Sequence, residues 1–378
     1  MIKSARKYIE DFKQIKRPFW AFQIEPTSRC RLRCIMCPRT CFSKEWKSRD
    51  MSISSYMKIS RHFQKVRHIH LQGWGEPLLH PKLFEMVRIA KSSGCKVSIT
   101  TSGQTFNSDN LERLVAERVD IITISIAGAS QETHESIRTG SDLDAIFKNV
   151  KWLGNYKKKI RSEIPRIHFS YLMTKTNLGE LPEFLGIAKG IGVQEVAATN
   201  LDYTPALLQD ELKIFFDKKI STLQRYIKKI EKTAAGLKLP LRIYPLVMEE
   251  EVVCELDPLH ILFIASDGKV SPCVYLKLPI DGMIPRIFCG SVIKVPQLSF
   301  GDINSQDLIE IWDKREYREF RENYVRRTEA LSEAYKDIDL NLFGTMGKMK
   351  KAEREMQKAL KVFPLPSFCR TCYKAYGI

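Results

Sequence analysis

Residues 25–39 have the sequence EPTSRCRLRCIMCPR, which places Cys30, Cys34 and Cys37 on one short stretch of chain. A cubane iron–sulfur cluster contains four irons, and cysteine thiolates are their usual protein ligands. Three thiolates on one tight loop can hold three irons and leave the fourth open, and an open metal position is where a small molecule can coordinate and react. The spacing therefore predicts a reactive cluster site. A zinc knuckle or unrelated buried thiols are the alternative interpretations.

Strand-like and helix-like segments alternate after this loop. Phe22 and Ile24 form a short expected strand that leads into it. Alternation of strands and helices is typical of βαβ units and a parallel sheet, so we expect an α/β fold, either a partial (β/α) barrel or an open doubly wound sheet. Sites in barrels lie at the C-terminal ends of the strands. Further strands are expected at 66–71, 96–101, 120–126, 167–173 and 193–200, with helices at 81–92, 108–117, 143–155 and 178–189.

The Cys-x3-Cys-x2-Cys spacing, on a loop after the first strand, resembles the signature of the radical S-adenosylmethionine (SAM) superfamily. The resemblance implies a partial (β/α)6 parallel barrel with a [4Fe–4S] cluster, one iron of it open, on Cys30, Cys34 and Cys37. It further implies that SAM binds the open iron and is reduced to methionine and a 5′-deoxyadenosyl radical, which takes hydrogen from a substrate. We therefore expect an enzyme, a radical SAM oxidoreductase or maturase.

Polar motifs at the ends of the later strands extend this resemblance. The turn Gly73-Trp74-Gly75-Glu76 is similar to the family's Gly-Gly-Glu motif, whose glycines allow close approach and whose glutamate holds the SAM amino group. A dinucleotide-binding loop is a rival interpretation, but Leu78 stands where its third glycine would be; a plain β-turn is another. By the same resemblance Ser125 would contact the ribose and Arg138 the SAM carboxylate. A hydroxyl bonded to its own strand and a solvated helix residue are the respective alternatives. The expected SAM contacts are Gly73, Trp74, Gly75, Glu76, Thr101, Ser125 and Arg138.

Two separated cysteine pairs lie far from the first loop. They resemble the Twitch/SPASM extension of radical SAM enzymes, but a full SPASM extension needs more cysteines than this part of the chain contains. The resemblance therefore implies one auxiliary [4Fe–4S] cluster, with zinc as the alternative metal. Cys289 could substitute for one ligand, and Cys41 and Cys95 are expected to be small apolar residues, although a ligand role for Cys41 stays open. The expected auxiliary ligands are Cys254, Cys273, Cys369 and Cys372.

The pattern of the chain changes after Thr204. One long basic amphipathic helix is expected over about 206–237, before Pro240, as a spacer between domains. A second helical stretch is expected over 306–334. The lysine-rich insertion before Cys369 could be a substrate clamp, a partner surface or a solvated helix. The expected parts are a basic helix over 1–18, the barrel over 19–203, a helical linker over 204–240 and the auxiliary-cluster domain over 241–378, with the insertion at about 322–366.

The chain carries 61 Lys and Arg against 44 Asp and Glu, a formal net charge of +17. An acidic flavodoxin or ferredoxin that delivers electrons is the partner we expect. Nucleic acid is compatible with this charge but not favoured, because the basic residues lack the aromatic interleaving of a single-strand binder. No apolar run reaches the roughly 20 residues of a membrane span, and the basic N-terminus lacks the apolar core of a secretory signal. We therefore expect a cytoplasmic protein.

The residues determine the substrate less well than the cofactor. Family analogy favours maturation of a peptide or protein, with dehydrogenation or rearrangement of a small hydroxylated metabolite as the second candidate. The auxiliary cluster could accept an electron from the substrate radical, anchor the substrate or relay electrons inward. An alternative of another class is a non-catalytic iron–sulfur electron-transfer or metal-binding protein, which predicts fully ligated metal and no SAM cleavage. RNA modification would require tRNA binding that weakens steeply with salt.

Overall fold

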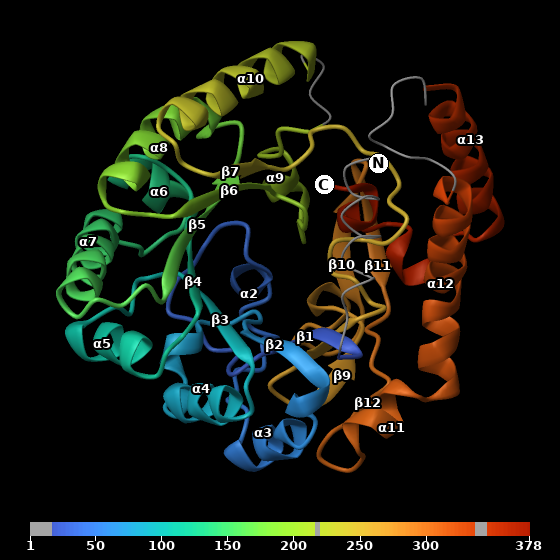
Figure 1. The fold of residues 1–378 in the computed structure, drawn as a ribbon, viewed down its shortest axis with the longest axis horizontal. Coiled ribbons are helices and arrows are strands. Elements are labelled where there is room, and N and C mark those ends of the chain that lie inside the picture. Colours follow the sequence, from blue (N-terminus) through green and yellow to red (C-terminus); the bar gives the residue numbers. More distant parts are fainter. Residues whose placement is uncertain (1–16, 216–219, 337–345) are drawn as a thin grey trace.

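Figure 1 shows the computed structural model of the chain, which describes residues 17–215, 220–336 and 346–378. A curved sheet carries helices on its outer side, and a pair of long helices lies at one edge of the molecule (Figure 1). The helix expected over 1–18 lies outside the described residues apart from positions 17 and 18. None of the helices in the described ranges is long and apolar enough to cross a membrane.

One ten-stranded sheet forms the centre of the fold, in the order β12-β9-β8-β1-β2-β3-β4-β5-β6-β7. Strands β1 to β7 are parallel, and β8 continues the parallel array on the other side of β1, so that Phe22 pairs with both Ile69 and Leu262. The six strands expected from the sequence are present, and the parallel α/β prediction is confirmed. The parallel strands are β1 (Phe19–Ile24), β2 (Val66–Leu71), β3 (Lys96–Thr101), β4 (Ile121–Ile126), β5 (Arg166–Met173), β6 (Glu195–Asn200), β7 (Leu241–Ile243) and β8 (Ile261–Ile264).

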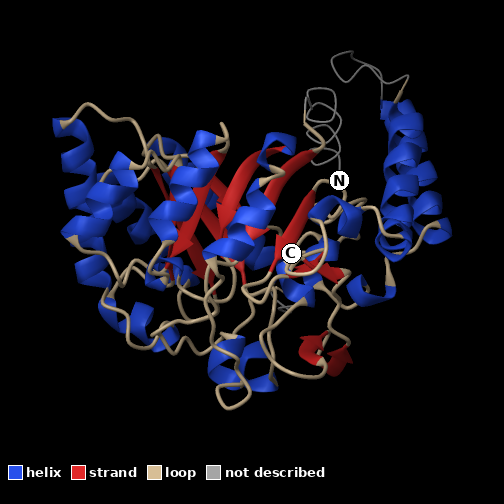
Figure 2. Cartoon of the chain, turned by 90° about the horizontal axis from the view of Figure 1, so that it is seen from below, coloured by secondary structure: helices blue, strands red, loops and turns tan. Residues whose placement is uncertain are grey.

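Alternation along each strand separates an apolar outer face from a polar inner face. In β4, Ile122, Ile124 and Ile126 are fully buried in the core, whereas Thr123 and Ser125 face a central cavity. Successive side chains of a strand point to opposite faces, so the sequence Ile-Ile-Thr-Ile-Ser-Ile produces both faces at once. Figure 2 shows the strands surrounded by helices from a second direction. The helices of the first half are α2 (Pro38–Cys41), α3 (Ile53–Ser60), α4 (Leu83–Ser92), α5 (Ser108–Ala116), α6 (Gln131–Ile137), α7 (Leu143–Lys159) and α8 (Leu181–Gly190).

The prediction of a single helix over 206–237 is wrong for the first part of that range. The structure has a short helix α9 (Leu207–Asp210), and α10 begins only at Ile220 and ends at Gly236. Between them the chain turns inward, because Lys213 donates to the hydroxyl of Tyr373 at 2.9 Å and Phe215 is buried. Helix α10 packs against α8 and leads into β7, which pairs with β6. The segment thus continues the strand–helix repeat of the barrel instead of forming a spacer.

The C-terminal region shares the sheet of the barrel. Strand β9 pairs antiparallel with β8, and β12 pairs antiparallel with β9. The Ser266-Asp267-Gly268 turn joins β8 and β9, with Gly268 at a φ of +87°. The helical stretch expected over 306–334 breaks at Asp313 and Lys314 into two helices. The remaining elements are β9 (Lys269–Ser271), β10 (Ile284–Phe288), β11 (Ser291–Val295), β12 (Gly301–Asp302), α11 (Leu308–Trp312), α12 (Arg315–Tyr335) and α13 (Met346–Val362).

Candidate active site and cluster sites

One cavity of about 1070 Å³ occupies the inside of the curved sheet. It is lined by the inner faces of the strands and by the loops at their C-terminal ends, where barrel sites are built. All ten residues expected to hold the first cluster and SAM lie on its lining: Cys30, Cys34, Cys37, Gly73, Trp74, Gly75, Glu76, Thr101, Ser125 and Arg138. The structure therefore brings together side chains that are more than a hundred positions apart in the sequence.

The cysteine loop is held by backbone hydrogen bonds. The Cys37 N–H donates to the Cys34 carbonyl at 3.1 Å, and the Ile35 N–H donates to the Ile137 carbonyl at 3.0 Å. Burial and the nearby Cys34 raise the pKa of Cys37 to about 12, and burial raises the pKa of Cys30. Such thiols stay protonated until a metal ion supplies the positive charge that stabilises the thiolate. Three thiols facing one cavity fit a cluster with one open iron.

The Gly73-Trp74-Gly75-Glu76 turn packs directly against the cysteine loop. A Cβ on Gly75 would overlap the Thr27 carbonyl oxygen and lie 2.7 Å from that of Arg29. A Cβ on Gly73 would overlap the side chain of Glu25, whose carboxylate accepts from the Trp74 N–H at 2.8 Å. Glycine is needed at both positions because backbone and side chain approach too closely for any other residue. The turn thereby fixes the position of the loop that carries the cysteines.

The Glu76 carboxylate joins this turn to the end of β3. One of its oxygens accepts from the Thr101 hydroxyl at 2.6 Å and the other from both the N–H and the hydroxyl of Ser102 at 2.7 Å. The first oxygen also accepts from the Leu78 N–H at 3.2 Å. Four donors from the chain itself occupy the acceptor positions that a carboxylate offers. Glu76 and Thr101 thus position the turn, and direct contact of Glu76 with the SAM amino group stays a prediction.

Trp74 connects the turn to the C-terminal region. Its indole N–H donates to the carbonyls of Val274 and Lys277, at 3.2 and 3.0 Å. Its ring packs against Tyr203 and Tyr275, with centroid distances of 5.7 and 5.9 Å. The sequence placed Trp74 beside the expected SAM site but gave no signal for this contact across 200 positions. The tryptophan closes one side of the central cavity with apolar surface.

Ser125 and Arg138 present unused hydrogen-bonding groups to the cavity. The Arg138 Nε is buried and has no hydrogen-bond partner among the described residues. Its backbone ends α6 by donating to the His134 carbonyl at 2.8 Å. The Ser125 hydroxyl also lacks a partner in the described part of the chain, so it is not bonded to its own strand. A buried guanidinium nitrogen without a partner is costly, and a bound carboxylate would supply one. These groups fit a ligand with a carboxylate and hydroxyls.

The four late cysteines line a second, smaller cavity. Burial and the neighbouring thiols raise the pKa of Cys254 and Cys273, and burial raises that of Cys369 to about 12. Within residues 17–215, 220–336 and 346–378, no group of three His, Cys, Asp or Glu could hold a single metal ion. Four cysteine thiols around one cavity are the ligands that a cubane cluster takes.

Two further residues of this second cavity were missed from the sequence. Arg286 on β10 is 3% exposed, and its Nε has no hydrogen-bond partner in the described structure. The hydroxyl of Tyr324 on α12 is also buried and lies beside the Cys369 thiol, and both Arg286 and Tyr324 line the cavity. Buried donors near a cluster stabilise its sulfurs, and a positive charge offsets the thiolates. Neither residue belongs to a motif with a recognisable spacing. In the sequence, Arg286 resembles an ordinary exposed strand residue.

The remaining cysteines lie away from both cavities. Cys289 is exposed at the turn between β10 and β11, with a φ of +49°. Cys41 is partly buried, and its sulfur accepts from the Gln209 amide at 3.2 Å. Cys95 is buried in the main core. None of the three lines either cavity in the described structure, so a ligand role for Cys41 or Cys289 gains no support.

The insertion is fastened to the segments that carry the auxiliary cysteines. Arg327 on α12 is fully buried, and its guanidinium donates to the Phe363 carbonyl at 2.6 Å, the Glu251 carbonyl at 3.1 Å and the Glu250 carboxylate at 2.5 Å. Glu250 and Phe363 lie just before Cys254 and Cys369 in the sequence. Helix α12 therefore supports the second cavity and is more than a solvated helix.

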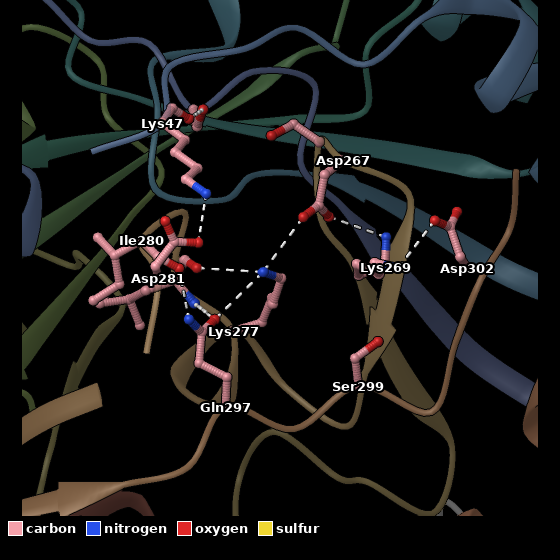
Figure 3. Close-up of polar contacts among 12 residues, drawn as sticks. Lys47, Asp267, Lys269, Lys277, Ile280, Asp281, Gln297, Ser299 and Asp302 are labelled. Carbon is pink, nitrogen blue, oxygen red and sulfur yellow. Dashed lines mark hydrogen bonds and ion pairs between the residues drawn. The ribbon is translucent and has the colours of Figure 1, made fainter. Parts of the chain in front are cut away.

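One ion pair joins the N-terminal loop to the C-terminal region, and polar contacts within the C-terminal region lie beside it (Figure 3). Lys47 pairs with Asp281, and Lys277 pairs with Asp267 at 3.3 Å. The Lys277 ammonium also donates to the amide oxygen of Gln297 at 3.3 Å. These contacts lie next to the carbonyls that receive the Trp74 indole N–H, so polar and aromatic contacts together hold the two regions around the cavity.

Comparisons with known proteins agree with this geometry. A model of the radical SAM superfamily matches residues 24–187, and a model of an iron–sulfur cluster-binding domain, SPASM, matches residues 254–335. A tungsten-containing aldehyde ferredoxin oxidoreductase cofactor-modifying protein from Pyrococcus furiosus is 30% identical over 317 residues, which cover 80% of this chain and 84% of that protein. The chain belongs to the radical SAM superfamily.

Solved structures show the same fold for this radical SAM enzyme. Streptococcus suis SuiB bound to S-adenosylmethionine gives a TM-score of 0.60 at 17% identity, covering 84% of this chain and 72% of SuiB. The structure of SuiB bound to the precursor peptide SuiA gives a TM-score of 0.58 at 16% identity, and the match covers 83% of this chain and 70% of SuiB. The enzyme thus uses a [4Fe–4S] cluster, SAM and an auxiliary cluster. The matched iron–sulfur domain contains Cys254 and Cys273 but ends before Cys369.

Proposed function

We propose that this radical SAM enzyme modifies a peptide or protein by abstracting hydrogen from a residue held between its two cluster sites. The observation that carries the proposal is a shared wall: Leu256, Tyr275 and Lys374 line both the central cavity and the auxiliary cavity. When bound, the first cluster and SAM supply a 5′-deoxyadenosyl radical. A substrate in the central cavity would lie against the SAM site on one side and the auxiliary site on the other.

The chain's own residues would have three tasks in this reaction. Cys30, Cys34 and Cys37 would hold the first cluster, and Cys254, Cys273, Cys369 and Cys372 the auxiliary one. Arg138 and Ser125 would bind the carboxylate and ribose of SAM, on a site whose shape is fixed by the Gly73–Glu76 turn. Trp74 and Tyr203 would exclude water, which a site for radical chemistry requires.

A peptide substrate is favoured by the size of the cavity and by the crystallised complex of SuiB with a precursor peptide. The inner face of the sheet favours a second candidate, a small hydroxylated molecule or a cofactor. Hydroxyl side chains line it from four strands, as sites for polar ligands require. The relative from Pyrococcus furiosus is named a cofactor-modifying protein, which agrees with this candidate. The hydroxyl residues are Ser98, Thr100, Thr123, Ser125, Ser170 and Thr199.

Deuterium transfer distinguishes the two candidates. Extract from the source organism grown in deuterated medium is separated by ultrafiltration into macromolecules and small molecules. Each fraction is incubated anaerobically with the reconstituted enzyme, reductant and unlabelled SAM. We expect deuterium in 5′-deoxyadenosine only with the macromolecular fraction, because the abstracted hydrogen comes from the substrate. Mass spectrometry of deoxyadenosine measures the transfer.

Protease treatment of the active fraction is the control for substrate class. Digestion to single amino acids is expected to abolish the transfer. Label that arises from the small-molecule fraction and resists protease would contradict a peptide substrate and support the second candidate. A reaction with enzyme but without reductant measures the background of deuterium in 5′-deoxyadenosine.

We infer that an acidic redox protein donates electrons at the cysteine loop. Arg31 and Arg33 stand between the cluster cysteines, are exposed, and form no ion pair in the described part of the chain. The cluster thus lies beneath an unpaired positive surface, where an acidic flavodoxin or ferredoxin would dock by charge complementarity.

Charge reversal tests this docking surface. We expect the Arg31→Glu, Arg33→Glu variant to slow reduction by flavodoxin about tenfold or more at low salt, because steering depends on complementary charge. Reduction by dithionite should remain unchanged. Lys158→Glu, Lys159→Glu at the exposed end of α7 is the matched control. Equal flavodoxin rates for both double variants, measured by stopped-flow absorbance, would refute the surface.

A further inference from the structure

A network of charged and phenolic side chains lines the central cavity and includes Tyr275, which packs against Trp74 of the Gly73–Glu76 turn. The Lys374 ammonium lies 2.9 Å from the Asp202 carboxylate and 3.4 Å from that of Glu255. Tyr275 donates to the other Asp202 oxygen at 3.0 Å, and Arg242 donates to Glu255 at 2.5 Å. The mechanism described above uses none of these charges. Two cations and two anions in contact make the network neutral as a whole.

The network joins the barrel to the segments of the auxiliary site. Asp202 and Arg242 come from the barrel, directly after β6 and from β7. On the other side, Glu255 follows Cys254, Tyr275 stands two residues after Cys273, and Lys374 stands two residues after Cys372. Three of the expected auxiliary ligands thus have a network member within two residues. Holding these cysteines on a cluster would also fix the side chains that face the substrate.

Lys374 occupies the position between the two sites. Its side chain is 8% exposed, and it lines both cavities together with Leu256 and Tyr275. Charges interact strongly where water is excluded, so an ammonium there acts on a cluster in the auxiliary cavity. One-electron reduction adds a negative charge to a cluster, and net charge nearby is one of the factors that set its potential. A nearby cation favours the reduced cluster, and a nearby anion opposes it.

We propose that Lys374 and Asp202 are positioning residues that set the reduction potential of the auxiliary cluster from the substrate side. Lys374 stabilises the reduced cluster, while Asp202 holds Lys374 in place and offsets part of its charge. A polar group of the substrate that binds Asp202 changes this balance, so occupation of the cavity is coupled to the potential. The inference rests on the two-cluster arrangement of the proposed function but not on the class of substrate.

The test is an anaerobic redox titration of the auxiliary cluster, followed by electron paramagnetic resonance, without substrate. The background is the full chain with Cys30, Cys34 and Cys37 changed to alanine, so that only the auxiliary cluster contributes. We expect Lys374→Met to lower the potential enough to change the ratio of reduced to oxidised cluster about tenfold, which is about 59 mV for one electron. Asp202→Asn is expected to raise it, and Lys374→Arg to leave it nearly unchanged.

Matched variants decide between electrostatic and merely structural roles. Lys91→Met removes one partner of a partly buried ion pair with Asp120 on the outside of the barrel, and should leave the potential unchanged. Structural damage would not shift the potential in opposite directions for Lys374→Met and Asp202→Asn. If Lys374→Met fails to assemble a cluster, the potential of Asp202→Asn alone tests the proposal. Asp202 lies on the barrel side, so its substitution does not alter the segments that carry the auxiliary cysteines. Potentials equal to that of Lys91→Met for both variants would overturn the proposal, whereas a failed deuterium transfer would concern only the substrate.

Discussion

Changing Cys30, Cys34 and Cys37 together to alanine is expected to abolish reductive cleavage of SAM while about four irons per chain remain. The three thiols line the central cavity, whereas Cys254, Cys273, Cys369 and Cys372 surround a separate one. The second site is built from the C-terminal region and from α12, so losing the first cluster leaves its ligands in place. The measurements are iron and sulfide content after anaerobic reconstitution, and 5′-deoxyadenosine by chromatography.

Single alanine variants of Cys41 and Cys95 are the controls for this prediction. Cys41 is the cysteine closest in sequence to the first three, and Cys95 is buried in the core. Neither should lower deoxyadenosine formation more than slightly, since neither lines a cavity. An iron content near zero in the triple variant would show that the late cysteines hold no cluster of their own. Continued SAM cleavage would show that the assigned ligands are wrong.

Short-range patterns explain what the sequence could predict. Strands β4 and β5 each show their apolar alternation within six to eight residues, and the three cysteines lie within eight positions. Such signals need no knowledge of the rest of the chain. They predicted the parallel sheet, the reactive loop and the Gly73–Glu76 turn. The resemblance to the radical SAM superfamily added Thr101, Ser125 and Arg138, which line the cavity at the carboxyl ends of the strands.

Contacts between distant segments could not be predicted in the same way. Strand β8 pairs with β1 across about 240 positions, and Trp74 donates to carbonyls of the C-terminal region. Nothing local distinguishes Arg286 or Tyr324 from ordinary surface or core residues, yet both face the auxiliary cavity. The helix expected over 206–237 failed for the same reason. Its pattern was amphipathic, but the burial of Phe215 and the bond from Lys213 to Tyr373 divide it.

Gly75→Ala is expected to reduce SAM cleavage by at least about a hundredfold, because misplacing a reacting group by about 1 Å can cost that much. The added Cβ would overlap the Thr27 carbonyl oxygen and approach that of Arg29, and both are backbone atoms of the cysteine loop. Backbone atoms cannot move aside as a flexible side chain can. The loop must therefore shift and carry Cys30 with it. Deoxyadenosine formation and the resonance signal of the reduced first cluster measure the effect.

Gly186→Ala is the matched control, because a Cβ at this position of α8 meets nothing within 4 Å. Alanine in a helix is favoured over glycine by up to about 1 kcal/mol, so this variant should be at least as stable as the parent and equally active. The Gly75→Ala variant should keep its auxiliary cluster, since the second cavity lies on other segments. Normal cleavage by Gly75→Ala would contradict the close packing of turn and loop. Loss of both clusters would instead show that the turn supports the whole junction, through the contacts of Trp74 with Tyr203 and Tyr275.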